Sequence, residues 1–165
     1  MATMAPDTLG RLYRQHAPAL RLYARQWPGN GEDHVHDAFL QLARQSPPPM
    51  RVPPWLYRVV RNLAFAANRA AARRRRREQQ ASVPESWFAV ADDPLHAKDL
   101  ARLLATLVLE LREVVVARIW GGLTFEEIAE LIGSSLPTAH RRYQAALIEL
   151  RERLTVDGHA SSLLW

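Results

Sequence analysis

The sequence contains no cysteine, a single lysine and no long uninterrupted run of apolar residues. The absence of cysteine excludes a disulfide scaffold, thiol catalysis and any zinc or iron–sulfur site with cysteine ligands. A membrane-spanning helix needs about 18 consecutive apolar residues, and no stretch approaches that. The first ten residues also lack the basic and apolar segments of a signal peptide. We therefore expect a cytoplasmic protein.

The charge is basic and unevenly distributed. Lys98 is the sole lysine among 22 basic residues, which stand against 17 acidic ones. Arginine carries a planar fork of donors that matches phosphate, so this bias favours a nucleic-acid partner, although codon usage in a GC-rich genome would produce the same bias. Residues 1–77 hold fourteen arginines and four acids, a net charge of +10, whereas residues 78–98 are at −3 and residues 99–165 at −2.

The change of composition after the run Arg73 to Arg77 indicates a domain boundary. We predict a first domain over residues 1–77, a linker over 78–98, a second domain over 99–154 and a tail over 155–165. With 48% apolar residues, the 165-residue chain can build two small cores.

The fold class predicted from the apolar spacing is all-α: two small helical domains joined by a flexible linker. Apolar residues recur every three or four positions, and no segment alternates long enough for a strand. We expect helices near residues 9–24, over 32–44, from about 54 into the arginine run, over 100–109, over 111–120, through 128–132 and over 136–154. Prolines 47, 48, 49, 53 and 54 predict an exposed extended loop.

The most informative stretch has the helix caps and the glycine turn of a helix-turn-helix. Thr124 and Glu127 have the spacing of a capping box, Gly133 suits a left-handed helix end, and Ser135 is a candidate N-cap for the next helix. Two helices joined by such a short glycine-containing turn place the second helix in the DNA major groove. An ordinary helical hairpin with a solvated polar face is the alternative.

The second helix divides into an apolar stripe and a polar face. The stripe contains Ala139, Tyr143, Ala146, Leu147 and Leu150. Arginine reads guanine, glutamine suits adenine, and serine or threonine suits phosphate. The candidate duplex-binding residues are therefore those at the start of this helix: Ser135, Pro137, Thr138, His140, Arg141, Arg142 and Gln144.

These motifs resemble the extracytoplasmic-function (ECF) sigma factors of bacterial RNA polymerase. The runs Leu111-Arg112-Glu113-Val114-Val115, Gly122 to Ala129 and Gly133-Ser134-Ser135 with Thr138 are similar to the family's fourth region, which binds the minus-thirty-five promoter element. The run Glu32 to Phe39 resembles the segment that docks on the clamp helices of the polymerase β′ subunit. The run Trp55 to Ala64, leading into the arginines, resembles the part that opens and reads the minus-ten element.

The resemblance implies two further sets of site residues. For contact with core polymerase they are Asp33, His36, Asp37, Phe39 and Gln41. For minus-ten recognition and melting they are Arg51, Trp55, Tyr57, Arg58, Arg61, Asn62, Arg69, Arg73 and Arg74. A basic groove with aromatic platforms is also what single-stranded DNA requires. Core positions for Trp55 and Phe65, and ordinary surface roles for Asp33 and Asp37, remain alternatives.

The implied function is a sigma factor that directs core polymerase to specific promoters and assists their opening. Its implied partners are core polymerase, through the β′ clamp helices and the β flap, promoter DNA, and an anti-sigma factor. We expect no catalytic residue, metal or cofactor, because the histidines lack metal-ligand spacing and the dipeptide His36-Asp37 has no companion phosphohydrolase motif. A stand-alone helix-turn-helix regulator and an RNA-binding helical protein are the competing hypotheses.

Overall fold

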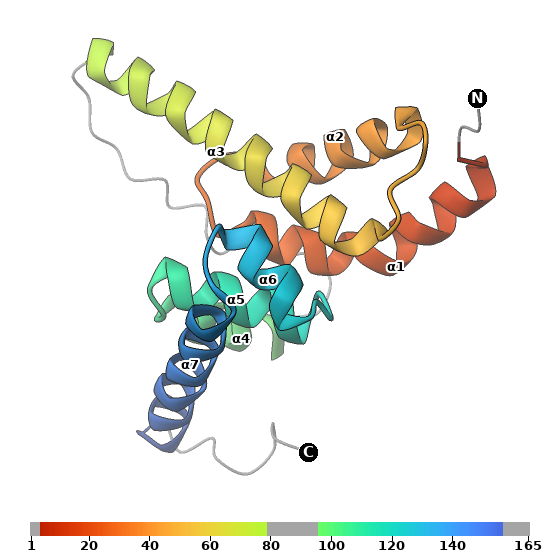
Figure 1. The fold of residues 1–165 in the computed structure, drawn as a ribbon. Coiled ribbons are helices and arrows are strands. Elements are labelled where there is room, and N and C mark those ends of the chain that lie inside the picture. The colour runs from red at the N-terminus through yellow and green to blue at the C-terminus, as the bar shows by residue number, and fades with distance from the viewer. Residues whose placement is uncertain (1–3, 79–95, 157–165) are drawn as a thin grey trace.

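A computed structural model describes residues 4–78 and 96–156, and within these ranges the chain contains helices and no strand (Figure 1). The described helices are α1 (Pro6–Ala24), α2 (Gly31–Arg44), α3 (Val52–Glu78), α4 (His96–Ala105), α5 (Leu109–Ile119), α6 (Phe125–Ile132) and α7 (Leu136–Val156). The all-α fold class is confirmed. None of these helices is long and apolar enough to cross a membrane.

The N-terminal half, residues 4–78, is a three-helix bundle. Helices α1, α2 and α3 pack on one another and bury Leu20, Val35, Leu42, Leu56 and Val60 completely. These positions repeat with helical spacing within each element, so each helix presents one apolar face to the bundle. The chain passes from α1 to α2 through Gly29, whose φ of 119° is accessible mainly to glycine.

The C-terminal half, residues 96–156, is a second helical unit in which α5 and α6 pack on α7. Val114, Val115, Leu123 and Ile128 are fully buried, as is Ala139 on α7. Because the buried residues of α7, Ala139 and Ala146, are both small, this helix lies close against the rest of the C-terminal half.

Several predicted helix ends were wrong. Helix α3 begins at Val52, so Pro53 and Pro54 occupy its first turn, where a missing amide costs little. The break between α4 and α5 lies at residues 106–108, because Thr106 donates its hydroxyl to the Leu103 carbonyl and ends α4. Helix α4 begins at His96, inside the predicted linker, and α7 continues to Val156; residues 79–95 and 157–165 lie outside the described part of the chain.

The two halves pack against each other, α1 on α5 and α3 on α6. At the centre of this junction is Glu113 of α5, whose residue is only 4% exposed. Its Oε1 accepts hydrogen bonds from the hydroxyl of Tyr23 and from Nε of Arg61, both at 2.6 Å. Burial and the neighbouring Glu113 carboxylate raise the pKa of Tyr23 well above its ordinary value, so Tyr23 stays a donor.

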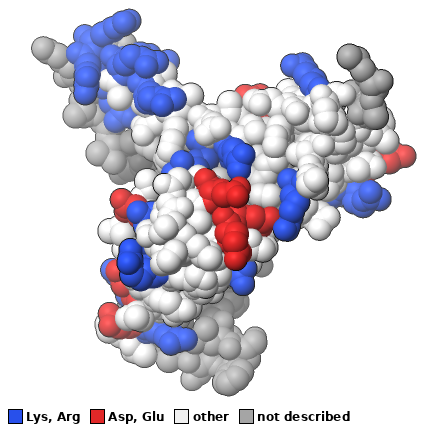
Figure 2. Space-filling view, viewed as in Figure 1, with Lys and Arg blue, Asp and Glu red and all other residues white. Residues whose placement is uncertain are grey.

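Helix α3 extends beyond the bundle. Its 27 residues correspond to a rod of about 40 Å, and its C-terminal end projects away from the other helices (Figure 1). Arginines 73 to 77 are exposed there and form the basic cluster at the tip of the molecule in Figure 2. The most basic part of the sequence is therefore exposed to solvent.

We expect substitution by phenylalanine to lower the free energy of unfolding at Tyr23 but not at Tyr57. Tyr23→Phe removes a donor from the buried Glu113 carboxylate, and we expect it to lower the free energy of unfolding by about 1–3 kcal/mol. The hydroxyl of Tyr57 is buried without a hydrogen-bond partner among the described residues, so Tyr57→Phe should leave stability unchanged or raise it by up to about 1 kcal/mol. Denaturant unfolding of both variants measures this; equal losses would contradict the assignment of the two hydroxyls.

Candidate nucleic-acid interface

The helix-turn-helix begins at a capping box on α6. The amide of Glu127 donates to Thr124 Oγ1 at 3.2 Å, and the amide of Thr124 donates to Glu127 Oε2 at 2.9 Å. Both side chains therefore satisfy amides that the first turn of a helix leaves without partners. This confirms the capping box predicted from the sequence.

The turn between α6 and α7 is closed by Gly133, at φ 64° and ψ 43°. The amide of Ser134 donates to the Ala129 carbonyl at 2.9 Å, which completes the glycine-dependent end of α6. Ser135 Oγ then accepts from the amide of Thr138 at 3.3 Å and caps α7. Each element of the predicted turn is present, so the turn fixes the direction in which α7 leaves α6.

The predicted duplex-binding residues are brought together on the first turns of α7. Ser135 and Thr138 share a hydroxyl–hydroxyl hydrogen bond of 2.9 Å, and Arg141 Nη2 donates to Thr138 Oγ1 at 3.2 Å. This line of linked side chains holds the Arg141 guanidinium along the helix while leaving Arg141 exposed. Donors aimed outward from a rigid helix are suited to phosphates and base edges.

The other predicted residues of α7 differ in exposure. Pro137, His140 and Gln144 are exposed, and Arg142 is half-buried. The imidazole of His140 stacks on the ring of Phe125, with centroids 3.8 Å apart. His140 therefore ties α7 to α6 as well as facing solvent.

The sequence analysis missed Leu136. This first residue of α7 is 38% exposed and adjoins the exposed Pro137, so the helix start presents an apolar edge beside its hydroxyl groups. An exposed aliphatic group at such a position suits the methyl group of thymine. Its place directly after the N-cap was the available signal.

The polar residues predicted to bind the minus-ten element are Arg51, just before α3, and six residues on α3, and they separate into two groups. Asn62, Arg69, Arg73 and Arg74 are exposed along the middle and outer part of the helix. The other group faces the C-terminal half: Arg51 Nη1 lies 2.9 Å from Glu127 Oε1, Arg58 Nη2 lies 3.4 Å from Glu130 Oε2, and Arg61 binds Glu113. Figure 2 shows acidic and basic side chains meeting where α6 lies against α3.

One of the aromatic residues of α3 is packed more deeply than the sequence predicted. Tyr57 is 1% exposed, and its ring lies 4.7 Å from that of Tyr23; its predicted contact with DNA is therefore wrong for this arrangement, because the ring belongs to the core. Burial raises the pKa of Tyr57 well above its ordinary value. Trp55 and Phe65 are half-buried against the core, and the Arg61 guanidinium lies over Phe65 at 4.3 Å from its ring centroid.

The exposed face of α2 gathers four of the five residues predicted to contact core polymerase: Asp33, His36, Asp37 and Gln41. Phe39 is the exception. It is buried and packs edge-on against Tyr13 at 4.8 Å between ring centroids, so its predicted surface contact is wrong. Leu40, seven residues after Asp33, also belongs to this face and is 42% exposed; it was missed because it is apolar and follows the buried Phe39.

The described residues contain no group of three or more histidine, cysteine, aspartate or glutamate side chains that could hold a metal ion.

A capped helix-turn-helix with an exposed polar recognition helix, joined to a basic helical bundle, defines a DNA-binding protein of the transcription class. Residues 97–150 match the family model described as sigma-70, region 4. The chain is 30% identical over 158 residues to the RNA polymerase sigma factor CarQ of Myxococcus xanthus, a match that covers 91% of each protein. The chain therefore belongs to the sigma factors of bacterial RNA polymerase, of the extracytoplasmic-function type, which direct the polymerase to promoters.

Two solved structures share the fold. The sigma factor RpoE of Bartonella quintana, in complex with the anti-sigma factor NepR, superposes with a TM-score of 0.76 at 24% identity, covering 93% of this chain and 99% of that one. CnrH, in complex with the cytosolic domain of CnrY, gives a TM-score of 0.57 at 24% identity, covering 93% and 91%. The order and packing of the helices are thus those of known sigma factors.

Gly133 offers a direct test of the turn. A Cβ at this position meets no atom within 4 Å, so the only unfavourable effect of Gly133→Ala is the strain of an alanine at positive φ. We expect the free energy of unfolding to fall by about 1–2 kcal/mol. The matched control is Gly10→Ala within α1, where a Cβ meets only the flexible end of Arg14 at 3.6 Å; there helix propensity should raise stability by about 0.5–1 kcal/mol. Denaturant unfolding that ranks the two variants in the reverse order would contradict a left-handed turn at Gly133.

Proposed function

We propose that this sigma factor uses three separate surfaces: the start of α7 for the minus-thirty-five duplex, α3 for the minus-ten element and its melting, and α2 for core polymerase. The proposed division is a first domain over residues 1–77, a linker over 78–98, a second domain over 99–154 and a tail over 155–165. The protein acts in the cytoplasm by binding, with no catalysis of its own.

The observation that carries this proposal is the hydrogen-bonded line Ser135, Thr138 and Arg141 at the start of α7, a helix whose direction is fixed by capped turns. In a helix-turn-helix this end of the second helix faces the major groove. Its serine and threonine hydroxyls suit phosphates, and Arg141 and Arg142 suit guanine.

The exposed side chains of α3 support a role with the opened strands. Asn62, Arg69, Arg73 and Arg74 follow one another along a projecting helix, and such a basic track attracts the DNA backbone. Trp55, half-buried at the start of the helix, is the aromatic candidate that remains after Tyr57 is assigned to the core.

The face of α2 suits a protein partner. Asp33 and Asp37 stand one helical turn apart with the exposed Leu40 and Gln41 beside them. An apolar side chain within a rim of carboxylates fits a basic surface with an apolar centre, which we assign to the β′ clamp helices. The β flap is the proposed contact of the C-terminal domain.

Regulation by an anti-sigma factor is part of the proposal. The two solved structures with this fold, RpoE and CnrH, were obtained with NepR and with the cytosolic domain of CnrY. A protein that covers either DNA-binding half would also remove the gain in affinity that two tethered modules provide.

Reconstitution with core polymerase tests the function. We expect the purified chain to bind core enzyme of the same organism and to direct initiation at defined sites in a genomic library, mapped by transcript start sequencing. Asp33→Asn with Asp37→Asn should weaken core binding about tenfold, whereas Glu126→Gln with Glu152→Gln, an equal change of charge on α6 and α7, should not. Duplex footprints with no core affinity would instead favour a stand-alone regulator.

Arg142 tests the assignment of α7. Arg142→Ala should weaken binding to the upstream promoter element by about 1–3 kcal/mol or less, with little effect on core affinity, because the side chain lies on the recognition helix. Arg151→Ala, an exposed arginine near the other end of α7, is the matched control. Fluorescence anisotropy with duplex DNA gives both affinities; an unchanged value for Arg142→Ala removes this residue from the interface. Binding of RNA hairpins that survives loss of Arg141 and Arg142 would favour the RNA-binding alternative.

A further inference from the structure

The chain contains three asparagines, and one of them is followed by glycine. Asn30 precedes Gly31 at the start of α2, whereas Asn62 and Asn68 lie within α3 and precede larger residues. An asparagine loses its side-chain nitrogen by deamidation when the backbone nitrogen of the next residue attacks it. The attack requires an accessible carboxamide, a backbone N–H that no acceptor holds, and a next residue that does not block the approach.

The carboxamide of Asn30 is accessible. Asn30 is the N-cap residue of α2, and its side chain makes no capping hydrogen bond. It is exposed and lines an open groove of about 380 Å³ together with Arg21, Arg25, Gly29, Gly31 and Glu32. The carboxamide can therefore turn towards the next residue, and water reaches it.

The nitrogen of Gly31 meets the other two conditions. Gly31 is the first residue of α2, where a backbone N–H has no acceptor within the helix, and glycine has no side chain to block the approach. Packing explains why glycine is present, since a Cβ at this position would lie 3.0 Å from Cβ of Ala24 on α1. The close approach of α1 and α2 therefore requires the residue that makes Asn30 reactive.

We propose that Asn30 is a modification site that deamidates without an enzyme and becomes aspartate or isoaspartate. The nitrogen of Gly31 forms a bond to Cγ of Asn30, and the bond from Cγ to Nδ2 breaks. The departing amino group takes the proton of the backbone amide and leaves as ammonia. Water then adds to either carbonyl of the cyclic imide and opens it, which leaves one new carboxylate.

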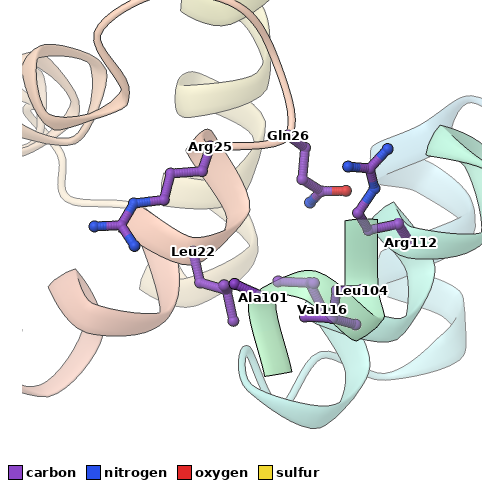
Figure 3. A pocket seen from close by; sticks show the side chains of 7 residues that line it. All are labelled: Leu22, Arg25, Gln26, Ala101, Leu104, Arg112 and Val116. Carbon is purple, nitrogen blue, oxygen red and sulfur yellow. The ribbon is translucent and has the colours of Figure 1, made fainter. Parts of the chain in front are cut away.

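The local charge favours this reaction. The attacking nitrogen gives up its proton, and the positive end of a helix stabilises the negative charge that develops there. Arg25 borders the same groove and takes part in no ion pair among the described residues. Figure 3 shows its guanidinium pointing away from Gln26 and Arg112, with which it borders a second cavity of about 20 Å³. Arg25 therefore adds a positive charge beside Asn30.

The new carboxylate extends an acidic face. Asn30, Asp33 and Asp37 are separated by three and four residues, so they lie along one side of α2, and all three are exposed. This is the face assigned to core polymerase, and the effect on binding rests on that proposed function. A third carboxylate strengthens the attraction to a basic partner surface, so the aspartate product binds core polymerase more tightly than the unmodified chain.

Peptide mass spectrometry of the purified full chain tests the reaction itself. During incubation at neutral pH, we expect the mass gain of deamidation to appear about tenfold faster at Asn30 than at Asn62, which is also exposed, because the amide that follows Asn62 is held by a helix hydrogen bond. The digest should contain both aspartate and isoaspartate at position 30. Equal rates at the two asparagines, or a mass gain without isoaspartate, would overturn the proposal.

Two variants test the effect on binding. Asn30→Asp reproduces the aspartate product, and Asn30→Ser is the matched control, since both side chains serve as N-caps and only the first is charged. At low salt Asn30→Asp should bind core polymerase about two- to fivefold more tightly than Asn30→Ser, and the difference should shrink as ionic strength rises. Equal affinities would overturn the effect assigned to the modification. If instead the assignment of α2 to core polymerase is wrong, Asp33→Asn with Asp37→Asn leaves core affinity unchanged, and the mass measurement at Asn30 still stands.

Discussion

The carboxylate of Glu113 is the contact on which the arrangement of the whole molecule depends. It is buried between Tyr23 of α1 and Arg61 of α3, from which it is separated by 90 and 52 residues of sequence. A buried carboxylate is tolerated only when donors surround it. Glu113 therefore requires α1, α3 and α5 to meet in one register, and any motion that separates the halves must return this carboxylate and Arg61 to water together.

Helix α3 carries two tasks that compete for its surface. One face supplies Leu56, Tyr57 and Val60 to the core, so Tyr57, one of the two aromatic residues predicted to contact DNA, is committed to the core. The proposed DNA-binding task falls to arginines, which are paired with carboxylates near the start of the helix and exposed at its projecting end. Because the same helix is a core element and, in the proposed function, a DNA-binding element, packing of the C-terminal half onto it has consequences for the proposed DNA binding.

The sequence predicted the features that depend on neighbouring residues. The capping box at Thr124, the left-handed Gly133 and the cap at Ser135 are each decided within four residues, and all were found. What could not be predicted depends on residues far apart. Helical spacing indicates which side of α2 or α3 is apolar, but the depth of Phe39 and Tyr57 is set by Tyr13 and Tyr23 on α1. The pairing of Arg58 with Glu130 spans 72 residues and leaves no local pattern.

These contacts give a physical reason for the uneven distribution of charge along the chain. A DNA-binding half with more acids than arginines is unfavourable for a phosphate backbone, yet residues 99–165 are at −2 whereas residues 1–77 are at +10. Three of the nine acids in residues 99–165, Glu113, Glu127 and Glu130, face the N-terminal half rather than the exposed start of α7. They therefore complement the basic half of the same molecule at short range and lie away from the residues assigned to the duplex. For these three carboxylates, the repulsion of a DNA backbone is thus confined to the surface where the two halves meet.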